Sequence, residues 1–296
     1  MMMRKLLKFC LFLLYANPLI AAIYVLPLDG NVIGKLHFVH PQPGETLSEV
    51  GVRFDIGFDE MRRANPHVDE EQPLSPHLTL LIPSQFVLPA APRRGLVINL
   101  PEYRLYYFPE NDNVVITYPV GIGRQGWNTP VGVTQVIAKQ KDPVWRPTAN
   151  LKAYANEQGQ LLPEEFPPGP VNPLGRYVLR LGWPTYLIHG TNHADGVGMR
   201  VSAGCIRMLP DDIEYLYELV QVGTPVRVIN EPLKLGELNG MLYLEAHPVL
   251  KEKCSTDLQG LAERLFRHLN KNSSINQNVL HQELKRLSGV PRKISV

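Results

Sequence analysis

The chain has 296 residues, of which 44% are hydrophobic and 20% are charged. This is the composition of a globular protein and excludes an intrinsically disordered chain. The formal net charge is +2, and three of the 30 basic residues lie within the first eight positions, so the rest of the chain is close to neutral. Binding of nucleic acid needs a strongly basic face, so the composition argues against nucleic acid as a partner.

Residues 1–22 have the pattern of a secretory signal peptide. A basic start is followed by an apolar run from Phe9 to Leu14 and by the small residues Ala21 and Ala22. We expect cleavage after Ala22. The alternative is an uncleaved anchor, although the uninterrupted apolar run is shorter than the ~20 residues of a membrane span. The pattern therefore predicts export.

Residues 37–83 are predicted to form a β-α-α-β unit, with short strands at 37–40 and 78–82. The first helix is expected to begin at Thr46, with Glu49 completing a capping box, and the second to end at Asn65 before Pro66.

The motifs of this unit resemble a LysM module. Pro43-Gly44-Glu45-Thr46-Leu47 matches its start, Ala64-Asn65-Pro66 its central turn and Leu81-Ile82-Pro83 its end, whereas Ser75-Pro76-His77 departs from the usual pattern. The resemblance implies binding of N-acetylglucosamine chains, and the alternative is a module that serves only as a spacer.

A proline-rich connector at 83–94 leads into a strand-rich region that ends near residue 230. Only one main helix is predicted there, beginning at Asp211 with Glu214 as its capping partner. Many strands with one helix indicate a mainly β domain, either a β-sandwich or barrel-like. The expected strands cover 95–100, 104–108, 114–118, 131–139, 177–181, 186–189 and 226–229.

Two further segments complete the chain. Residues 143–175 are rich in proline and are predicted to be an irregular loop, a mobile lid over the site. Residues 231–296 are predicted to be a short α-rich C-terminal extension, with one strand at 242–244 and two amphipathic helices along 258–269 and 280–287.

The candidate chemistry lies in His189 and Cys205. A histidine ends an apolar strand, and a cysteine follows sixteen residues later, beside Gly204. A thiol is only a few per cent ionised at neutral pH, so a nucleophilic cysteine needs a base, and imidazole can take and return that proton. Gly204 leaves the backbone bare for N–H groups that face an oxyanion, and Arg207 offers a planar fork for a carboxylate.

The surrounding motifs resemble the L,D-transpeptidase catalytic domain over about residues 94–230. The resemblance rests on His189-Gly190-Thr191 and Ser202-Ala203-Gly204-Cys205-Ile206-Arg207-Met208. It extends to Val120-Gly121-Ile122-Gly123, Thr129-Pro130-Val131-Gly132 and Asn172-Pro173-Leu174-Gly175. The module order is similar to that of the Gram-negative branch, which implies a periplasmic location.

The resemblance implies a specific reaction on peptidoglycan. The cysteine forms a thioester with the meso-diaminopimelate carbonyl of a tetrapeptide stem, and D-alanine leaves. An amine then attacks, either the C-terminal lysine of Braun's lipoprotein or another stem, which gives a 3→3 cross-link. Carbapenems acylate this family, and no cofactor or metal is implied.

The resemblance also implies roles for individual residues. Cys205 is the nucleophile, His189 the general base and acid, and the Gly190 carbonyl the third member of the triad. Amides around Gly204 and Cys205 form the oxyanion hole, and Arg207 orients the substrate or braces the loop. Ser202 is expected on the substrate side, although some relatives carry histidine there, so the base should not depend on it.

Several alternatives stay open from the sequence. His193 is a rival base in a polar turn, zinc could be held by His189, His193, Cys205 and Cys254, and a Cys205–Cys254 disulfide would remove the nucleophile. At the level of function, the alternatives are a non-catalytic peptidoglycan-binding adaptor and an L,D-carboxypeptidase that uses water as acceptor.

Overall fold

The computed structural model describes residues 22–70, 72–250, 252, 256–267 and 274–296. The expected signal peptide other than Ala22, and Cys254, lie outside these residues. Within the described residues, the helices are too short or too polar to span a bilayer.

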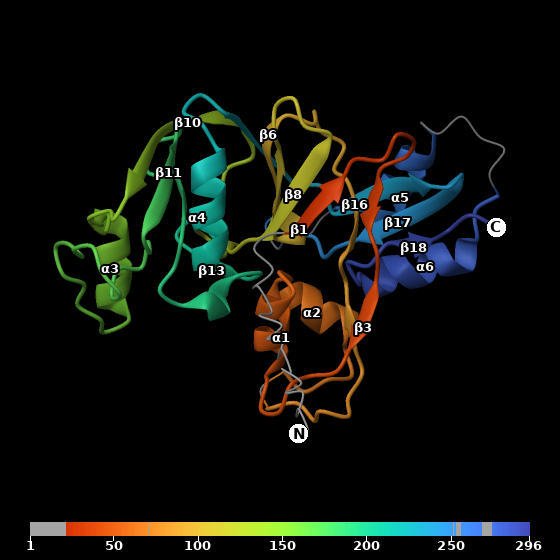
Figure 1. The fold of residues 1–296 in the computed structure, drawn as a ribbon, viewed down its shortest axis with the longest axis horizontal. Coiled ribbons are helices and arrows are strands. Elements are labelled where there is room, and N and C mark those ends of the chain that lie inside the picture. The colour runs from red at the N-terminus through yellow and green to blue at the C-terminus, as the bar shows by residue number, and fades with distance from the viewer. Residues whose placement is uncertain (1–21, 71, 251, 253–255, 268–273) are drawn as a thin grey trace, which may run out of the picture.

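The strand-rich region is built on one curled sheet of nine strands, in the order β1-β8-β7-β6-β15-β10-β11-β12-β14 (Figure 1). The β15–β6 and β12–β14 pairs are parallel and the others are antiparallel. The expected mainly β fold is confirmed, and β1 is an addition that the pattern did not predict. The strands are β1 (Ala22–Val25), β6 (Gly95–Asn99), β7 (Arg104–Phe108), β8 (Val114–Pro119), β10 (Gly132–Lys141), β11 (Tyr177–Leu181), β12 (Leu187–His189), β14 (Ile206–Arg207) and β15 (Pro225–Ile229).

The sheet curls around helix α4 (Pro210–Leu219). Alternate residues such as Leu96 and Ile98 join Ile213 and Leu216 of the helix in one core. The predicted start of this helix is wrong by one residue, because Pro210 occupies its first turn and no side chain caps it. Glu214 instead accepts a hydrogen bond from the Tyr177 hydroxyl.

The segment 143–175 is not wholly irregular, so the expectation of one main helix is wrong. It contains α3 (Ala149–Glu157), whose first turn is capped by the Thr148 hydroxyl. This helix buries only Ala155, so its sequence lacks the apolar stripe from which a helix is predicted. The remaining short elements of the region are η1 (Leu100–Glu102), β9 (Ile122–Gly123), η2 (Ala194–Gly196) and β13 (Arg200–Ser202), with β13 paired to β9.

The predicted β-α-α-β order is confirmed for residues 37–83. Strand β3 (His37–Val39) pairs with β4 (Leu80–Ile82), and α1 (Leu47–Arg53) and α2 (Phe58–Ala64) lie between them in the chain. The Thr46–Glu49 capping box is present.

This unit is fused to the nine-stranded sheet. Leu47, Met61 and Ile82 share a buried core with Val97 and Tyr106, which lie on the face of the sheet opposite α4. The connector contributes β5 (Gln85–Val87), which pairs with β2 (Val32–Gly34), so it is not a free linker.

The C-terminal extension holds more strand than predicted. It contains β16 (Leu233–Leu238), β17 (Met241–Ala246) and β18 (Arg292–Lys293) in one sheet, with α5 (Leu258–Arg267) and α6 (Gln277–Arg286) packed on it. A buried ion cluster attaches it to the nine-stranded sheet, since Lys234 lies 2.7 Å from Glu102 and 2.8 Å from Glu245. Glu102, Glu245 and His247 have the spacing of metal ligands, but the Lys234 ammonium already supplies positive charge between the two carboxylates.

Candidate active site

Parallel pairing of β12 with β14 brings His189 and Cys205 together. The register sets Ile188 beside Ile206 and His189 beside Arg207, so Cys205 lies just before β14, next to the strand that ends in His189. Residues sixteen positions apart thereby line one cavity of about 550 Å³.

His189 is buried, with 4% of its surface exposed. Its Nδ1 lies 2.6 Å from the Gly190 carbonyl, an acceptor, so Nδ1 carries the proton and Nε2 is left as the basic nitrogen. Burial and, less strongly, the Arg207 charge lower the pKa of His189 to about 4, although the bond to Gly190 opposes both. The imidazole is therefore neutral at pH 7 and ready to accept a proton, with Gly190 in the position that the resemblance implied.

Cys205 is half-buried, and its thiol donates to the Thr185 carbonyl at 3.6 Å. Burial raises the pKa of the thiol to about 11, although a backbone bond from Leu187 and the Arg207 charge oppose this. The resting sulfur is therefore a neutral thiol, and it needs a base at the moment of attack.

The loop that carries Cys205 is held by hydroxyl groups. Ser202 donates to the Cys205 carbonyl at 2.5 Å and accepts from the Gly204 amide at 3.1 Å, while Thr129 donates to the Gly204 carbonyl at 2.9 Å. Ser202 thus braces the nucleophile loop and also lines the cavity, while the Gly204 amide already donates to the Ser202 hydroxyl. The expected substrate-side role of Ser202 and oxyanion role of Gly204 stay predictions, and Thr129 is a bracing residue that sequence reasoning missed.

Gly204 is required for a steric reason. Its φ is +104°, and a Cβ there would lie 2.9 Å from the Tyr186 ring. A side chain would therefore displace the loop that presents Cys205.

Two arginines with unpaired N–H groups line the same cavity. The Nε of Arg207 and the Nε and Nη2 of Arg124 are buried and have no hydrogen-bond partner among the described residues. Arg124 is held by stacking, with its guanidinium 4.0 Å from the centre of the Tyr154 ring in α3 and 5.0 Å from that of Trp127. Such groups bind carboxylates, and Arg124 was missed because its role depends on a helix that the pattern did not predict.

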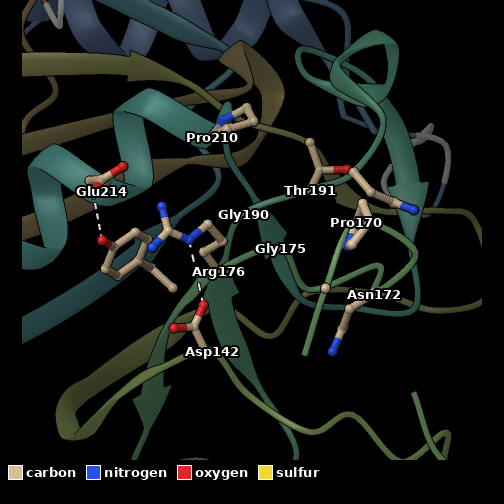
Figure 2. A pocket seen from close by; sticks show the side chains of 12 residues that line it. Asp142, Pro170, Asn172, Gly175, Arg176, Gly190, Thr191, Pro210 and Glu214 are labelled. Carbon is tan, nitrogen blue, oxygen red and sulfur yellow. Dashed lines mark hydrogen bonds and ion pairs between the residues drawn. The ribbon is translucent and has the colours of Figure 1, made fainter. Parts of the chain in front are cut away.

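A second cavity, of about 540 Å³, lies beyond the end of β12 (Figure 2). Gly190 and Thr191 contribute to its wall, but its charged side chains are already paired, Arg176 with Asp142 and Glu214 with a tyrosine hydroxyl. This pairing favours the first cavity as the place for the chemistry.

The structure also shows where the alternative candidate residues lie. His193 is exposed and does not line the cavity with Cys205, so His189 is the base that the geometry favours. Cys254 lies outside the described residues, so the proposed disulfide and the zinc set that include it stay untested.

Comparisons with known proteins show which family the chain resembles. The YkuD family model, described as the L,D-transpeptidase catalytic domain, matches residues 93–228. The chain is 43% identical to "Probable L,D-transpeptidase YcfS" of Escherichia coli K12, over 79% of this chain and 74% of that one. It is 38% identical to "Probable L,D-transpeptidase ErfK/SrfK" of Salmonella typhimurium, over 99% and 98% of the two chains. A solved catalytic domain of the L,D-transpeptidase from E. faecium is 23% identical, with a TM-score of 0.37, and covers 48% of this chain and 100% of that one. The identity to the two curated relatives, over most of each chain, shows that the chain belongs to the L,D-transpeptidase family.

Proposed function

We propose that this L,D-transpeptidase works on periplasmic peptidoglycan through a thioester on Cys205. The observation that carries the proposal is the hydrogen bond from His189 Nδ1 to the Gly190 carbonyl, beside a neutral thiol in one cavity. It fixes the tautomer in which Nε2 is the free base.

The first half-reaction forms the thioester. His189 Nε2 takes the thiol proton as the Cys205 sulfur attacks the carbonyl of the meso-diaminopimelate–D-alanine bond. The oxyanion role falls to the Cys205 amide, since Ser202 already accepts from the Gly204 amide. The imidazolium then returns its proton to the departing nitrogen, and D-alanine leaves.

The second half-reaction releases the enzyme. An acceptor amine attacks the thioester carbonyl, His189 takes the amine proton, and that proton passes to the departing sulfur. The acceptor is the C-terminal lysine of a Braun-type lipoprotein or the amine of another stem, which gives a 3→3 cross-link. Transfer to water instead would make the protein a carboxypeptidase.

The two arginines support a stem peptide as donor. A tetrapeptide stem carries carboxylates on its D-alanine and on the free end of diaminopimelate. Arg124 and Arg207 present buried N–H groups in this cavity that have no partner in the described part of the chain, which suits planar recognition of such groups. A neutral donor would leave these N–H groups unpaired.

We further propose that residues 37–83 are a LysM-like module that binds glycan strands, and that the signal peptide exports the chain to the periplasm. The first proposal rests on the quoted motifs together with the β-α-α-β order of β3, α1, α2 and β4. Glycan binding would be tested by a pull-down of the protein with purified glycan strands, with a polysaccharide of another sugar and without stem peptides as the control.

The central experiment uses the full mature chain, a disaccharide-tetrapeptide donor and two acceptors, a lysine-ended peptide and a tripeptide stem. Intact-mass spectrometry should show the stem minus D-alanine on the wild-type chain and on His193→Ala, and no adduct on Cys205→Ala. His189→Ala should form the adduct at least ~100-fold more slowly, the usual size of general-base catalysis. Ertapenem should add the mass of one drug molecule to the wild-type chain, as expected of an acyl-enzyme on a single cysteine. An adduct on Cys205→Ala would refute the nucleophile, and a wild-type chain that gains no mass from any donor would be an adaptor.

A further inference from the structure

Outside the active site, two carboxyl groups are buried close to each other without an ion pair of their own among the described residues. Asp55 directly follows the C-cap of α1, Asp212 lies in the first turn of α4, and each is 4% exposed. A hydrogen bond joins the two carboxyl groups, so one of them holds a proton. Apart from that bond, Asp55 Oδ1 and Asp212 Oδ2 are buried without partners among the described residues. Burying the remaining carboxylate charge costs several kcal/mol, so a cation that reached these oxygens would stabilise the pair.

The charged neighbours do not supply that cation. Arg104 faces Asp55 from β7, but its guanidinium is bound by Glu60 of α2 through bonds of 2.9 and 2.8 Å. Tyr24 of β1 and Tyr118 of β8, which also face these carboxyls, are neutral phenols, and Asp211 adds a further negative charge. Burial accordingly raises the pKa of Asp55 to about 7, and burial together with the Asp55 charge raises that of Asp212.

One backbone nitrogen already reaches this site. The amide of Ala22, at the start of β1, donates to Asp55 Oδ2 at 3.1 Å. Ala22 is held there by pairing of β1 with β8, in which it lies opposite Thr117. The sequence also places the end of the predicted signal peptide at this point.

We propose that the exported chain is cut between Ala21 and Ala22, and that the freed α-ammonium of Ala22 is the missing cation of the Asp55–Asp212 site. An endopeptidase that cuts after small residues would hydrolyse the Ala21–Ala22 amide. Water supplies the oxygen of the new Ala21 carboxylate, and the Ala22 nitrogen keeps its electron pair and is protonated.

The strand register selects Ala22 over the cleavage position expected from the sequence. Cleavage after Ala22 would put the ammonium on Ile23, which lies opposite Ile116 about 3.3 Å further along the strand. Successive N–H groups of a strand point to opposite sides, so that ammonium would face away from Asp55. Asp55 would also lose its Ala22 donor.

The proposed ion site joins three parts of the molecule. The ammonium belongs to the edge strand β1, Asp55 to the end of α1 in the predicted glycan-binding unit, and Asp212 to α4, which follows the Cys205 loop (Figure 1). Removal of the leader would therefore complete the packing of these parts only after export.

The test compares two leaderless chains made in the cytoplasm, where methionine aminopeptidase removes the initiator before alanine. One begins at Ala22 and the other at Ala21, so they differ only by one residue at the N-terminus. The Ala22 amine should react with an acylating reagent at pH 8 at least ~10-fold more slowly, since its pKa should rise above the ordinary 7.7–8.0. The Ala22 chain should also melt at a temperature higher by about 5 °C or more.

Variants and native processing complete the test. In the chain that begins at Ala22, Asp55→Asn and Asp212→Asn should restore ordinary amine reactivity, whereas the exposed control Asp112→Asn should not. Mass spectrometry of the protein exported by cells with its own leader should give Ala22 as the first residue. Another first residue, or equal amine reactivity of the two leaderless chains, would overturn the proposal, and neither result depends on a variant that fails to fold.

Discussion

The protonation states of Cys205 and His189 predict an unusual pH profile for acylation. Burial sets the pKa of His189 at about 4, compared with an ordinary value of 6.5. This difference is equivalent to about 3.4 kcal/mol against protonation, at about 1.36 kcal/mol per pH unit. With the thiol pKa at about 11, the reactive state is a neutral pair, imidazole and thiol, over a wide range of pH.

We therefore expect the second-order rate of acylation by ertapenem to rise as pH increases through about 4 and to stay level from about pH 5.5 to 8.5. Stopped-flow loss of the carbapenem absorbance measures this rate, and thiolate absorbance near 240 nm should not rise below about pH 9. In His189→Ala the level region should be replaced by a rate that climbs with hydroxide, because only the ionised thiol can then attack. The same depressed pKa has a linkage consequence: the unfolded chain binds more protons between pH 6.5 and 4, so the His189 contribution to stability is lost as pH falls through that window.

Two outcomes would refute this reasoning. A rate step centred near 6.5 would mean that His189 titrates as an exposed imidazole does. Thiolate absorbance already present at pH 7 would mean that the resting pair is an ion pair, and that the proton moves before the substrate arrives.

Two further predictions concern buried polar contacts. Thr129→Val should leave the Gly204 carbonyl without its donor and lower the free energy of unfolding by about 1–3 kcal/mol. Acylation measured by stopped flow should also slow, because the nucleophile loop loses its brace. An unchanged rate would contradict the bracing role. Arg104→Met should leave Glu60 buried without its partner and cost about 3–5 kcal/mol in denaturant unfolding at pH 8. The loss of stability should be smaller at pH 5, because the pKa of Glu60 is about 7 and a raised carboxyl pKa makes stability fall as pH rises. Equal losses at both pH values would argue against Arg104 as the partner of the Glu60 carboxylate.

The side chains of the candidate site were easier to single out from the sequence than the assembly around them. The structure brings His189, Cys205 and Arg207 into one cavity. They were singled out because a base, a thiol and a planar carboxylate-binding group are specific side chains at a recognisable spacing. The helices with a capping box or a clear apolar stripe were also predicted, whereas α3 was not, because it buries little. Arg124 escaped notice because its position depends on stacking against a ring in α3.

The fusion of residues 37–83 to the catalytic sheet could not be predicted for a different reason. The run Leu96-Val97-Ile98 is apolar at every position, which indicates a strand covered on both faces but does not say by what. In the structure α4 covers one face and α1 and α2 cover the other. Deletion of residues 37–83 would therefore expose Val97 and Tyr106, and it is not a clean test of glycan binding.

Direct contact between α2 and the loop before β13 gives a sharper test of how this unit affects catalysis. The amides of Phe58 and Asp59 donate to the carbonyls of Val197 and Gly198, each at 3.3 Å. This loop continues through β13 to Cys205, so a glycan held by the unit would be presented at a fixed distance from the nucleophile, and not on a flexible tether. Gly198→Ala tests the contact, because its φ is +80° and a new Cβ would lie 2.4 Å from the Phe58 nitrogen.

The matched control is Gly240→Ala in the β16–β17 turn, where φ is +75° and a Cβ would meet nothing within 4 Å. Both variants carry the backbone cost of alanine at positive φ, about 1–2 kcal/mol, but only Gly198→Ala adds a clash with backbone. We expect Gly240→Ala to lower the melting temperature without changing ertapenem acylation. Gly198→Ala should lower the melting temperature further and slow acylation, because the clash separates α2 from the loop that leads to Cys205. Equal behaviour of the two variants would show that the contact does not position the nucleophile, and the unit would then act on catalysis only through what it binds.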